Sequence, residues 1–340
     1  MEVGKLPNEL LARLLARIQP RDPRVLLGPA VGRDAAVIDT GGERLLVAKS
    51  DPITFASDHI GWYAVHVNAN DVACMGARPS WFLATILLPE ATAEEQASQV
   101  FGQLLDACDA LEIELVGGHT EITFGLDRPI VVGAMLGEVE REALVQPAGA
   151  REGDALILTK GVAIEGTAVL AREASATLER LGVPPPAVER AQRYIFEPGI
   201  SVVRDALTAC DALSTAGGVH AMHDPTEGGL ATALYEMAEA SGLGVTVRAE
   251  AITVLPETQA ICAAASLEPL GLLASGALLI AVAQRDCETV LAALRDGGIE
   301  ASRIGSMAKR EVGVIMGEHA GSLKVPRFAR DEVARFLASQ

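Results

Sequence analysis

Two short runs of the sequence combine carboxylates with paired glycines. Residues 223–230 read HDPTEGGL and place Asp224 and Glu227 before a predicted helix. Residues 116–123 read VGGHTEIT and place Glu121 where a strand is expected to end. Carboxylate oxygens bind Mg²⁺, and glycine leaves backbone amides open to phosphate oxygens. The two runs therefore predict one shared anionic ligand, a phosphate bridged by magnesium.

Three further aspartates stand beside glycine, asparagine or strand ends. Asp34 follows Gly32 in a predicted loop, Asp51 ends a predicted strand, and Asp71 lies in the run NANDVACMGARP. An aspartate at a strand end is also a common turn residue, so these positions carry weight only together. The predicted metal ligands are Asp34, Asp51, Asp71, Glu121 and Asp224.

The predicted helix 60–77 carries polar residues that are unusual in a helix interior. His66 and Asn70 are four residues apart and share a face, with Asp71 beside them. Asn and Asp form helix interiors poorly, so something must compensate for them. Either these side chains offer oxygen atoms to a metal-bound polyphosphate, or they form a polar stripe that faces solvent.

Histidines and lysines supply candidate phosphate contacts. His119 and His223 are candidate phosphate donors or proton carriers, and the alternative for each is a hydrogen-bonded structural histidine. Lys49 and Lys160 stand at predicted strand ends, where they contact either phosphate or solvent. His220 lies three residues before His223, but no third ligand stands at a spacing typical of zinc.

Composition narrows the class of protein. The formal charge is −17 and the pI is about 4.8, so the general field repels nucleic acid and anionic membranes, and a phosphate must be received locally. Five scattered cysteines without a CxxC pair indicate buried thiols in a reducing compartment. The longest apolar run, 271–283, is too short to span a bilayer, and we expect a cytoplasmic protein.

The sequence lacks the motifs of the common nucleotide-binding folds. No Walker loop, GxGxxG, GxSxG or HExxH run is present, which disfavours those folds.

Hydrophobic periodicity predicts an α+β structure in both halves of the chain. Thr92 and Glu95 have the spacing of a capping box for a helix to about 112. Pro, Gly and charge are concentrated at 146–154, so we place the domain boundary there, giving domains 1–148 and 149–340. Further helices are predicted at 6–18, 164–172, 200–210, 227–241 and 287–296, and strands at 35–39, 44–49, 80–88, 113–116, 129–137, 155–160, 245–247, 277–282 and 312–316.

Taken in order, six runs resemble the aminoimidazole ribonucleotide synthetase (AIR synthase) superfamily over nearly the whole chain. They are GRDAAVI, KSD, NANDVACMGARP, VGGHTEIT, HDPTEGGL and LLASGALLIAV, and GGHTE and HDPTEGGL resemble the branch of the hydrogenase maturation factor HypE. The resemblance implies an N-terminal α+β domain that forms a β-barrel across a homodimer interface, a C-terminal α+β domain, and ATP in the cleft between them. By position, Asp34, Asp51, Asn70, Asp71 and Glu121 match the family's metal and phosphate residues, Gly117, Gly118 and Thr120 match its loop, and Asp224 matches a contact from the C-terminal domain.

The resemblance also implies a chemistry, in which ATP and Mg²⁺ activate an amide or carboxyl-type oxygen by phosphorylation. HypE dehydrates a carbamoyl group on a C-terminal cysteine, whereas no cysteine follows Cys287 here and Ser339 cannot replace a thiolate. We therefore expect a HypE-like enzyme that acts on a small molecule. One alternative is a true carbamoyl dehydratase in NiFe hydrogenase cyanide-ligand maturation, working with a maturation partner protein. The other is a nucleotide-binding, non-catalytic scaffold.

Overall fold

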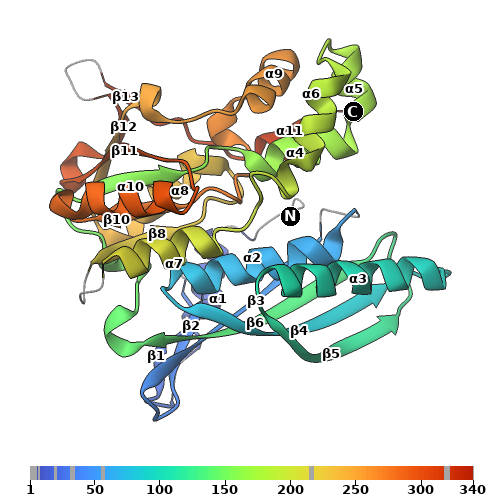
Figure 1. Ribbon diagram of the computed structural model, residues 1–340, viewed down its shortest axis with the longest axis horizontal. Coiled ribbons are helices and arrows are strands. Elements are labelled where there is room, and N and C mark those ends of the chain that lie inside the picture. Colours follow the sequence, from blue (N-terminus) through green and yellow to red (C-terminus); the bar gives the residue numbers. More distant parts are fainter. Residues whose placement is uncertain are drawn as a thin grey trace. The chain divides into compact units, whose positions relative to one another are not determined.

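The computed structural model describes residues 6, 8–18, 21–30, 35–54, 58–213, 218–317 and 322–339. Asp34, one of the predicted metal ligands, lies outside the described residues. The chain divides into two compact units, Met1–Leu144 and Val145–Gln340, and both mix helices and strands (Figure 1). The mixed α+β character predicted from the sequence is therefore confirmed for each unit.

The first unit is built on a six-stranded sheet in the order β1-β2-β3-β6-β4-β5. Neighbouring strands are antiparallel except β4 and β5, which are parallel and are joined through α3. The helices α2 and α3 lie along one face of this sheet (Figure 1). Its elements are α1 (Asn8–Leu15), β1 (Val25–Leu27), β2 (Ala36–Asp39), β3 (Arg44–Ile53), α2 (Ile60–Cys74), β4 (Arg78–Leu88), α3 (Glu94–Ala110), β5 (Glu114–Ile122) and β6 (Ile130–Glu140).

Side chains of this sheet alternate between a buried and a partly exposed face. Every second residue of β6, from Val131 to Val139, is buried beneath the helices, and the residues between them are partly exposed. Two of the buried positions are glycines that let α2 approach closely. A Cβ at Gly133 would lie 2.4 Å from Asn68 Nδ2, and one at Gly137 would lie 2.5 Å from Val72 Cγ1.

The polar residues of α2 do not form a solvent-facing stripe, so that alternative is wrong. His66 is 3% exposed, and Asn68 and Asn70 are fully buried. The expected compensation consists of hydrogen bonds to the backbone. Asn68 Nδ2 donates to the carbonyl oxygens of Ala64 and Asp51, at 2.8 and 3.2 Å, and His66 Nδ1 lies 2.9 Å from the Trp62 oxygen. The Asn68 amide nitrogen and the His66 ring nitrogen Nδ1 thus find partners inside the unit, whereas Asn68 Oδ1 does not among the described residues.

Two strands are longer than predicted, and this moves candidate residues from loops into strands. The ladder between β3 and β6 continues to Ile53, so Asp51 lies within β3, and β5 runs through the GGHTE motif to Ile122. The glycine pair indicated the end of a strand, but backbone pairing with β4 continues beyond it. The predicted capping box is also wrong by one residue, because Gln96 Oε1 accepts from the Ala93 amide at 3.1 Å.

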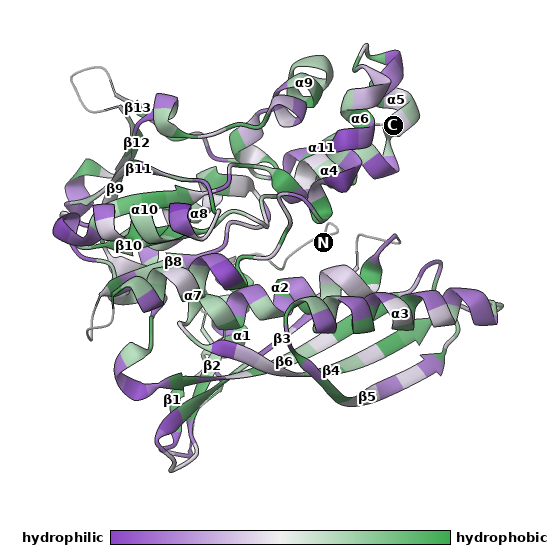
Figure 2. Cartoon of the chain, viewed as in Figure 1, coloured by the Kyte–Doolittle hydropathy of each residue, from purple (hydrophilic) through white to green (hydrophobic). Residues whose placement is uncertain are grey.

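The second unit contains a seven-stranded sheet in the order β13-β12-β9-β11-β7-β10-β8. Strand β10, which lies between β7 and the edge strand β8, is hydrophobic along its length (Figure 2), as is typical of a strand covered on both faces. The elements are β7 (Ala155–Thr159), α4 (Ile164–Glu173), α5 (Ser175–Arg180), α6 (Pro185–Gln192), α7 (Val203–Ala212), β8 (Val219–His223), α8 (Gly229–Ser241), β9 (Gly244–Val247), α9 (Pro256–Ala265), β10 (Leu279–Val282), α10 (Cys287–Asp296), β11 (Ala301–Ala308), β12 (Val314–Met316), β13 (Leu323–Lys324) and α11 (Glu332–Leu337).

Several of these elements were not anticipated from the sequence, including β8, α9, β11, β13 and α11. The helix α11 packs against the amino-terminal half of the same unit, near α4. Across the described parts of both units, no helix combines the length and apolar character needed to traverse a bilayer.

Candidate functional site

Three predicted site residues meet in the first unit, between β3 and α2. Lys49 Nζ lies 2.6 Å from Asp71 Oδ2 and 3.5 Å from Asp51 Oδ2. Lys49 and Asp51 are two residues apart on β3 and therefore share a face of the sheet, toward the helix that carries Asp71. The side chains of Lys49 and Asp71 are only 18% and 8% exposed, whereas that of Asp51 is 42% exposed. The carboxylate of Asp51 thus opens this cluster to solvent.

Two asparagines belong to the surroundings of this cluster. Asn70, a predicted phosphate contact, is fully buried next to Asp71 in α2. Asn68, a polar residue of the predicted helix, was not among the predicted site residues. Its amide nitrogen donates to the Asp51 carbonyl, and its Oδ1 atom is buried without a hydrogen-bond partner among the described residues. The run NAND was the sequence signal for this residue, because two asparagines in one helix need hydrogen-bond partners once they are buried.

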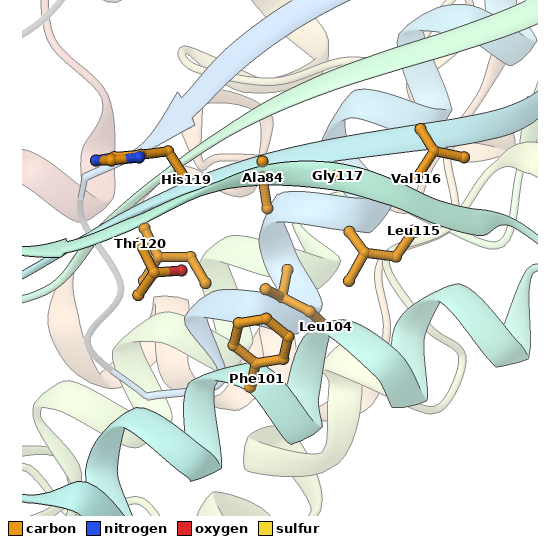
Figure 3. Close-up of a pocket in the computed structure, with 10 residues that line it drawn as sticks. Ala84, Phe101, Leu104, Leu115, Val116, Gly117, His119 and Thr120 are labelled. Atoms are coloured by element: carbon orange, nitrogen blue, oxygen red, sulfur yellow. The ribbon is translucent and has the colours of Figure 1, made fainter.

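The carboxylate of Glu121 does not join this cluster within one chain. In the sheet order, β6 and β4 separate β5 from β3. The register pairs Thr120 with Ile86 on the face toward the helices, so His119 and Glu121 lie on the opposite face. These two side chains are exposed and contact each other, with His119 Nε2 3.1 Å from Glu121 Oε2. Figure 3 shows His119 on the side of the strand away from Phe101.

A cavity of about 360 Å³ lies beside the GGHT motif, between α3 and the strands β4 and β5. Phe101 and Leu104 line it from α3, Ala84 and Ile86 line it from β4, and the Thr120 side chain points into it (Figure 3). Most of the side chains that line it are apolar, and His119 and Thr120 of the motif supply polar groups at one end. This combination is typical of small-molecule sites, which are mostly apolar with a few placed polar groups.

The two glycines of the motif have different roles in the structure. Gly118 has a φ of +150°, and a Cβ there would lie 1.9 Å from the Ala84 carbonyl oxygen. Glycine is therefore required at this position for β5 to pack against β4. At Gly117, the nearest atom to an added Cβ is Leu83 Cδ2 at 3.9 Å, so the strand could accept a side chain there.

In the second unit, the HDPTEGGL run forms the connection between β8 and α8. A hydrogen bond to Asp331 joins it to the C-terminal segment. Asp224 is 2% exposed. Gly228 has a φ of +77°, and its amide donates to Asp331 Oδ2 at 2.8 Å. Asp331 Oδ1 accepts at 2.8 Å from the Val333 amide, as the N-cap of α11.

Glu165, at the start of α4, is a buried carboxyl that sequence reasoning missed. Burial raises the pKa of Glu165 to about 7, and the negative charges of Asp331, Asp224 and Glu227 act in the same direction. Burial also raises the pKa of Asp331. The predicted residue Asp224 therefore stands among acidic groups, and only the tertiary structure reveals it. Within the described ranges, however, no three His, Cys, Asp or Glu side chains are arranged to hold one metal ion.

The remaining candidates bind partners of their own unit. His223 Nε2 lies 2.8 Å from Glu236 Oε2, and His220 Nδ1 lies 2.8 Å from the buried Asp154 Oδ2, so the two histidines have separate partners. Lys160 Nζ lies 3.1 Å from Asp205 Oδ1, and burial lowers the pKa of Lys160. This lysine is a buried ion-pair partner, and the solvated alternative for it is wrong.

Two α+β units in this order, with an acidic cluster under the first sheet and a GGHT strand at its edge, define the two-domain class of AIR synthase related proteins. The N-terminal domain of that family matches residues 32–139, and its C-terminal domain matches residues 151–317. The chain belongs to the AIR synthase related protein family.

Curated relatives at about 30% identity are named for hydrogenase maturation. The "Putative hydrogenase expression/formation protein" of Methanocaldococcus jannaschii is 30% identical over 83% of this chain and 82% of its own length. The carbamoyl dehydratase HypE of Cupriavidus necator is 31% identical over 80% of this chain and 76% of its own length. The chain is thus HypE-like within the family.

Solved structures share the fold over nearly the whole chain. The hydrogenase maturation protein HypE in complex with ATP has a TM-score of 0.70 at 26% identity, over 94% of this chain and 95% of that chain. HypE in a complex with HypF has a TM-score of 0.72 at 21% identity, over 87% of this chain and 93% of that chain.

Proposed function

We propose that this protein is an ATP- and Mg²⁺-dependent enzyme that activates an amide or carboxyl-type oxygen of a small molecule by phosphorylation. The observation that carries the proposal is the meeting of Lys49, Asp51 and Asp71 at the position where the family resemblance implies a phosphate site. Membership of the AIR synthase related family and the likeness to an ATP complex of HypE support it.

The donor set at this cluster fits a cation. The carboxylates of Asp51 and Asp71 both lie near the Lys49 ammonium group, so their combined negative charge favours a positive charge at this point. Mg²⁺ takes oxygen ligands of this kind together with phosphate oxygens and water, and would neutralise charge on the phosphates. Asp51 and Asp71 would hold it. Asp34, Glu121 and Asp224 stay the other predicted metal ligands, although Glu121 of the same chain lies on the opposite face of the sheet.

The residues around the nucleotide would act by binding and orientation. Phe101 and Leu104 offer an apolar wall, and Thr120 offers a hydroxyl at the polar end of the cavity. Lys49 supplies a positive charge for phosphate, and His119 and His223 remain the candidate donors or proton carriers. A site of this kind accelerates phosphoryl transfer through placed charge and position.

Calorimetry with ATP, in the presence and absence of Mg²⁺, tests the proposal. We expect Mg²⁺-dependent binding that weakens about tenfold or more in Asp71→Asn and in Asp224→Asn, because each loses a full negative charge. Asp106→Asn, an exposed change on α3, serves as the control and should bind as the unaltered protein does. Release of ADP with a panel of small amides and acids would then identify the acceptor class. Binding without any turnover would favour the non-catalytic scaffold.

Carbamoyl dehydration is a second candidate function, because a relative at 31% identity is named carbamoyl dehydratase HypE. The cysteines of this chain do not favour it. Burial raises the pKa of Cys108 to about 11 and those of Cys210 and Cys262 to about 12, so these thiols are poor nucleophiles. Mass spectrometry after incubation with a carbamoyltransferase partner tests it, since a carbamoylated cysteine that loses water when ATP is added would establish the HypE reaction.

A homodimer is part of the same proposal. The sheet face opposite α2 and α3 carries partly exposed apolar side chains, including Leu46 on β3, Leu136 on β6 and Leu83 on β4. Apolar faces of this kind mark interaction surfaces. The proposed barrel would form when two such faces pack together, and the five free cysteines agree with a reducing cytoplasm.

A further inference from the structure

Lys49 stands in the place that a divalent cation would be expected to take. Its ammonium nitrogen contacts Asp71 Oδ2 at 2.6 Å and lies 3.5 Å from Asp51 Oδ2. Asp51 and Asp71 are the two proposed metal ligands that the structure brings to one point. A divalent ion and this ammonium compete for the same pair of carboxylates, since two positive charges within a few ångströms repel each other.

The surroundings make this competition effective. The side chains of Lys49 and Asp71 are 18% and 8% exposed, so water screens their attraction less than it would at the surface. Asp51 is more open, with 42% of its side chain exposed. A divalent ion arriving alone must therefore displace a nearly buried ammonium from the more buried carboxylate.

We propose that Lys49 couples metal binding to nucleotide binding. Without nucleotide, its ammonium neutralises Asp71 and Asp51 and keeps divalent ions off this pair. A polyphosphate supplies a new anionic partner, to which the flexible lysine side chain turns, and the carboxylates then receive the metal. Metal and polyphosphate bind cooperatively, and each raises the affinity for the other by the same factor. The identity of the polyphosphate rests on the proposed function, whereas the exclusion of the metal does not.

Mn²⁺ binding to the full chain without nucleotide, followed by electron paramagnetic resonance of the free ion, tests the exclusion. We expect Lys49→Met to bind Mn²⁺ about tenfold or more tightly than the unaltered protein, because a positive charge about 3 to 4 Å away has been removed. Lys49→Gln should gain the same site. Lys49→Arg keeps the charge and should bind Mn²⁺ as weakly as the unaltered protein. Adding Asp71→Asn to Lys49→Met should abolish the gain.

Addition of a non-hydrolysable ATP analogue tests the coupling. The unaltered protein should now bind Mn²⁺, and its difference from Lys49→Met should shrink to about threefold or less, because the lysine has moved to the phosphates. Thermal unfolding of each variant, monitored by circular dichroism, ensures that only folded proteins are compared.

The outcomes separate this inference from the proposed function. The role of Lys49 is overturned if the unaltered protein and Lys49→Met bind Mn²⁺ equally without nucleotide. It is also overturned if neither Lys49→Met nor Lys49→Gln, both folded, binds Mn²⁺ more tightly than the unaltered protein. If the ATP analogue binds to none of the proteins, the proposed function and the coupling both fail, while the nucleotide-free comparison still decides whether Lys49 excludes the metal.

Discussion

At the scale of single residues, Glu165 shows how burial changes a carboxyl group. Its pKa is raised from 4.5 to about 7, first by burial and then by the nearby acidic groups. The folded protein therefore holds a proton that the unfolded chain releases in this range of pH. The stabilising contribution is complete below about pH 4.5 and is lost as the pH rises through about 7.

Glu165→Gln should remove this dependence. Relative to the unaltered protein, the variant should gain about 3 kcal/mol in free energy of unfolding between pH 4.5 and pH 8, because glutamine carries no charge to bury. Urea denaturation across that range measures the difference. Glu173→Gln, an exposed change on the same helix, should leave the pH profile unaltered. Parallel profiles for Glu165→Gln and the unaltered protein would contradict the assignment.

Asp331 is a second residue whose role depends on distant partners. It accepts hydrogen bonds from the Gly228 amide in the HDPTEGGL run and from the Val333 amide of its own helix. Asp331→Ala should lower the free energy of unfolding by about 1 to 3 kcal/mol, since a helix cap and a bond to a charged acceptor are lost. Chemical denaturation measures the loss. Asp211→Ala, an exposed change on α7, is the control, and equal stabilities of the two variants would argue against a fastening role.

At the scale of elements, β5 depends on the close contact of Gly118 with β4. Gly118→Ala should destabilise the first unit by about 2 to 4 kcal/mol, because the added Cβ meets the Ala84 carbonyl at 1.9 Å. Gly117→Ala, one residue earlier, adds the same atom at an ordinary contact distance of 3.9 Å from Leu83 Cδ2 and should cost about 1 kcal/mol or less. Thermal unfolding compares the two. A Gly118→Ala variant as stable as Gly117→Ala would mean that β5 can move away from β4.

The same strand shows how far sequence reasoning reaches for an element. Alternation and apolar content predicted most of the helices and strands, because burial on one face imposes a period on the sequence. The GGHTE run was interpreted as the end of a strand, since glycine is unfavourable within one. Pairing with β4 supplies the backbone hydrogen bonds for this run, and only the three-dimensional partner makes that visible.

At the scale of the whole molecule, the open face of the first sheet is the surface where we expect a second copy. The protein should sediment at twice its chain mass of 35.5 kDa. Leu83→Glu, which places a charge on that face, should shift it to the monomer, because burying an unpaired carboxylate in an apolar interface is costly. Leu105→Glu, at a somewhat more exposed leucine on α3, should leave the dimer intact. A monomeric unaltered protein would remove the proposed barrel.

The sequence by itself determined the α+β class, the candidate acids and the resemblance to a family, because residue types, their spacing and their period are local properties. It also placed Asp51 and Asp71 among the candidates without showing that they share a partner. The tertiary structure decided that Lys49 joins them, that Glu121 lies on the other face of the sheet, and that Glu165 is buried among acidic groups. These relations depend on strand register, sheet order and helix packing, which bring together residues that no local pattern connects.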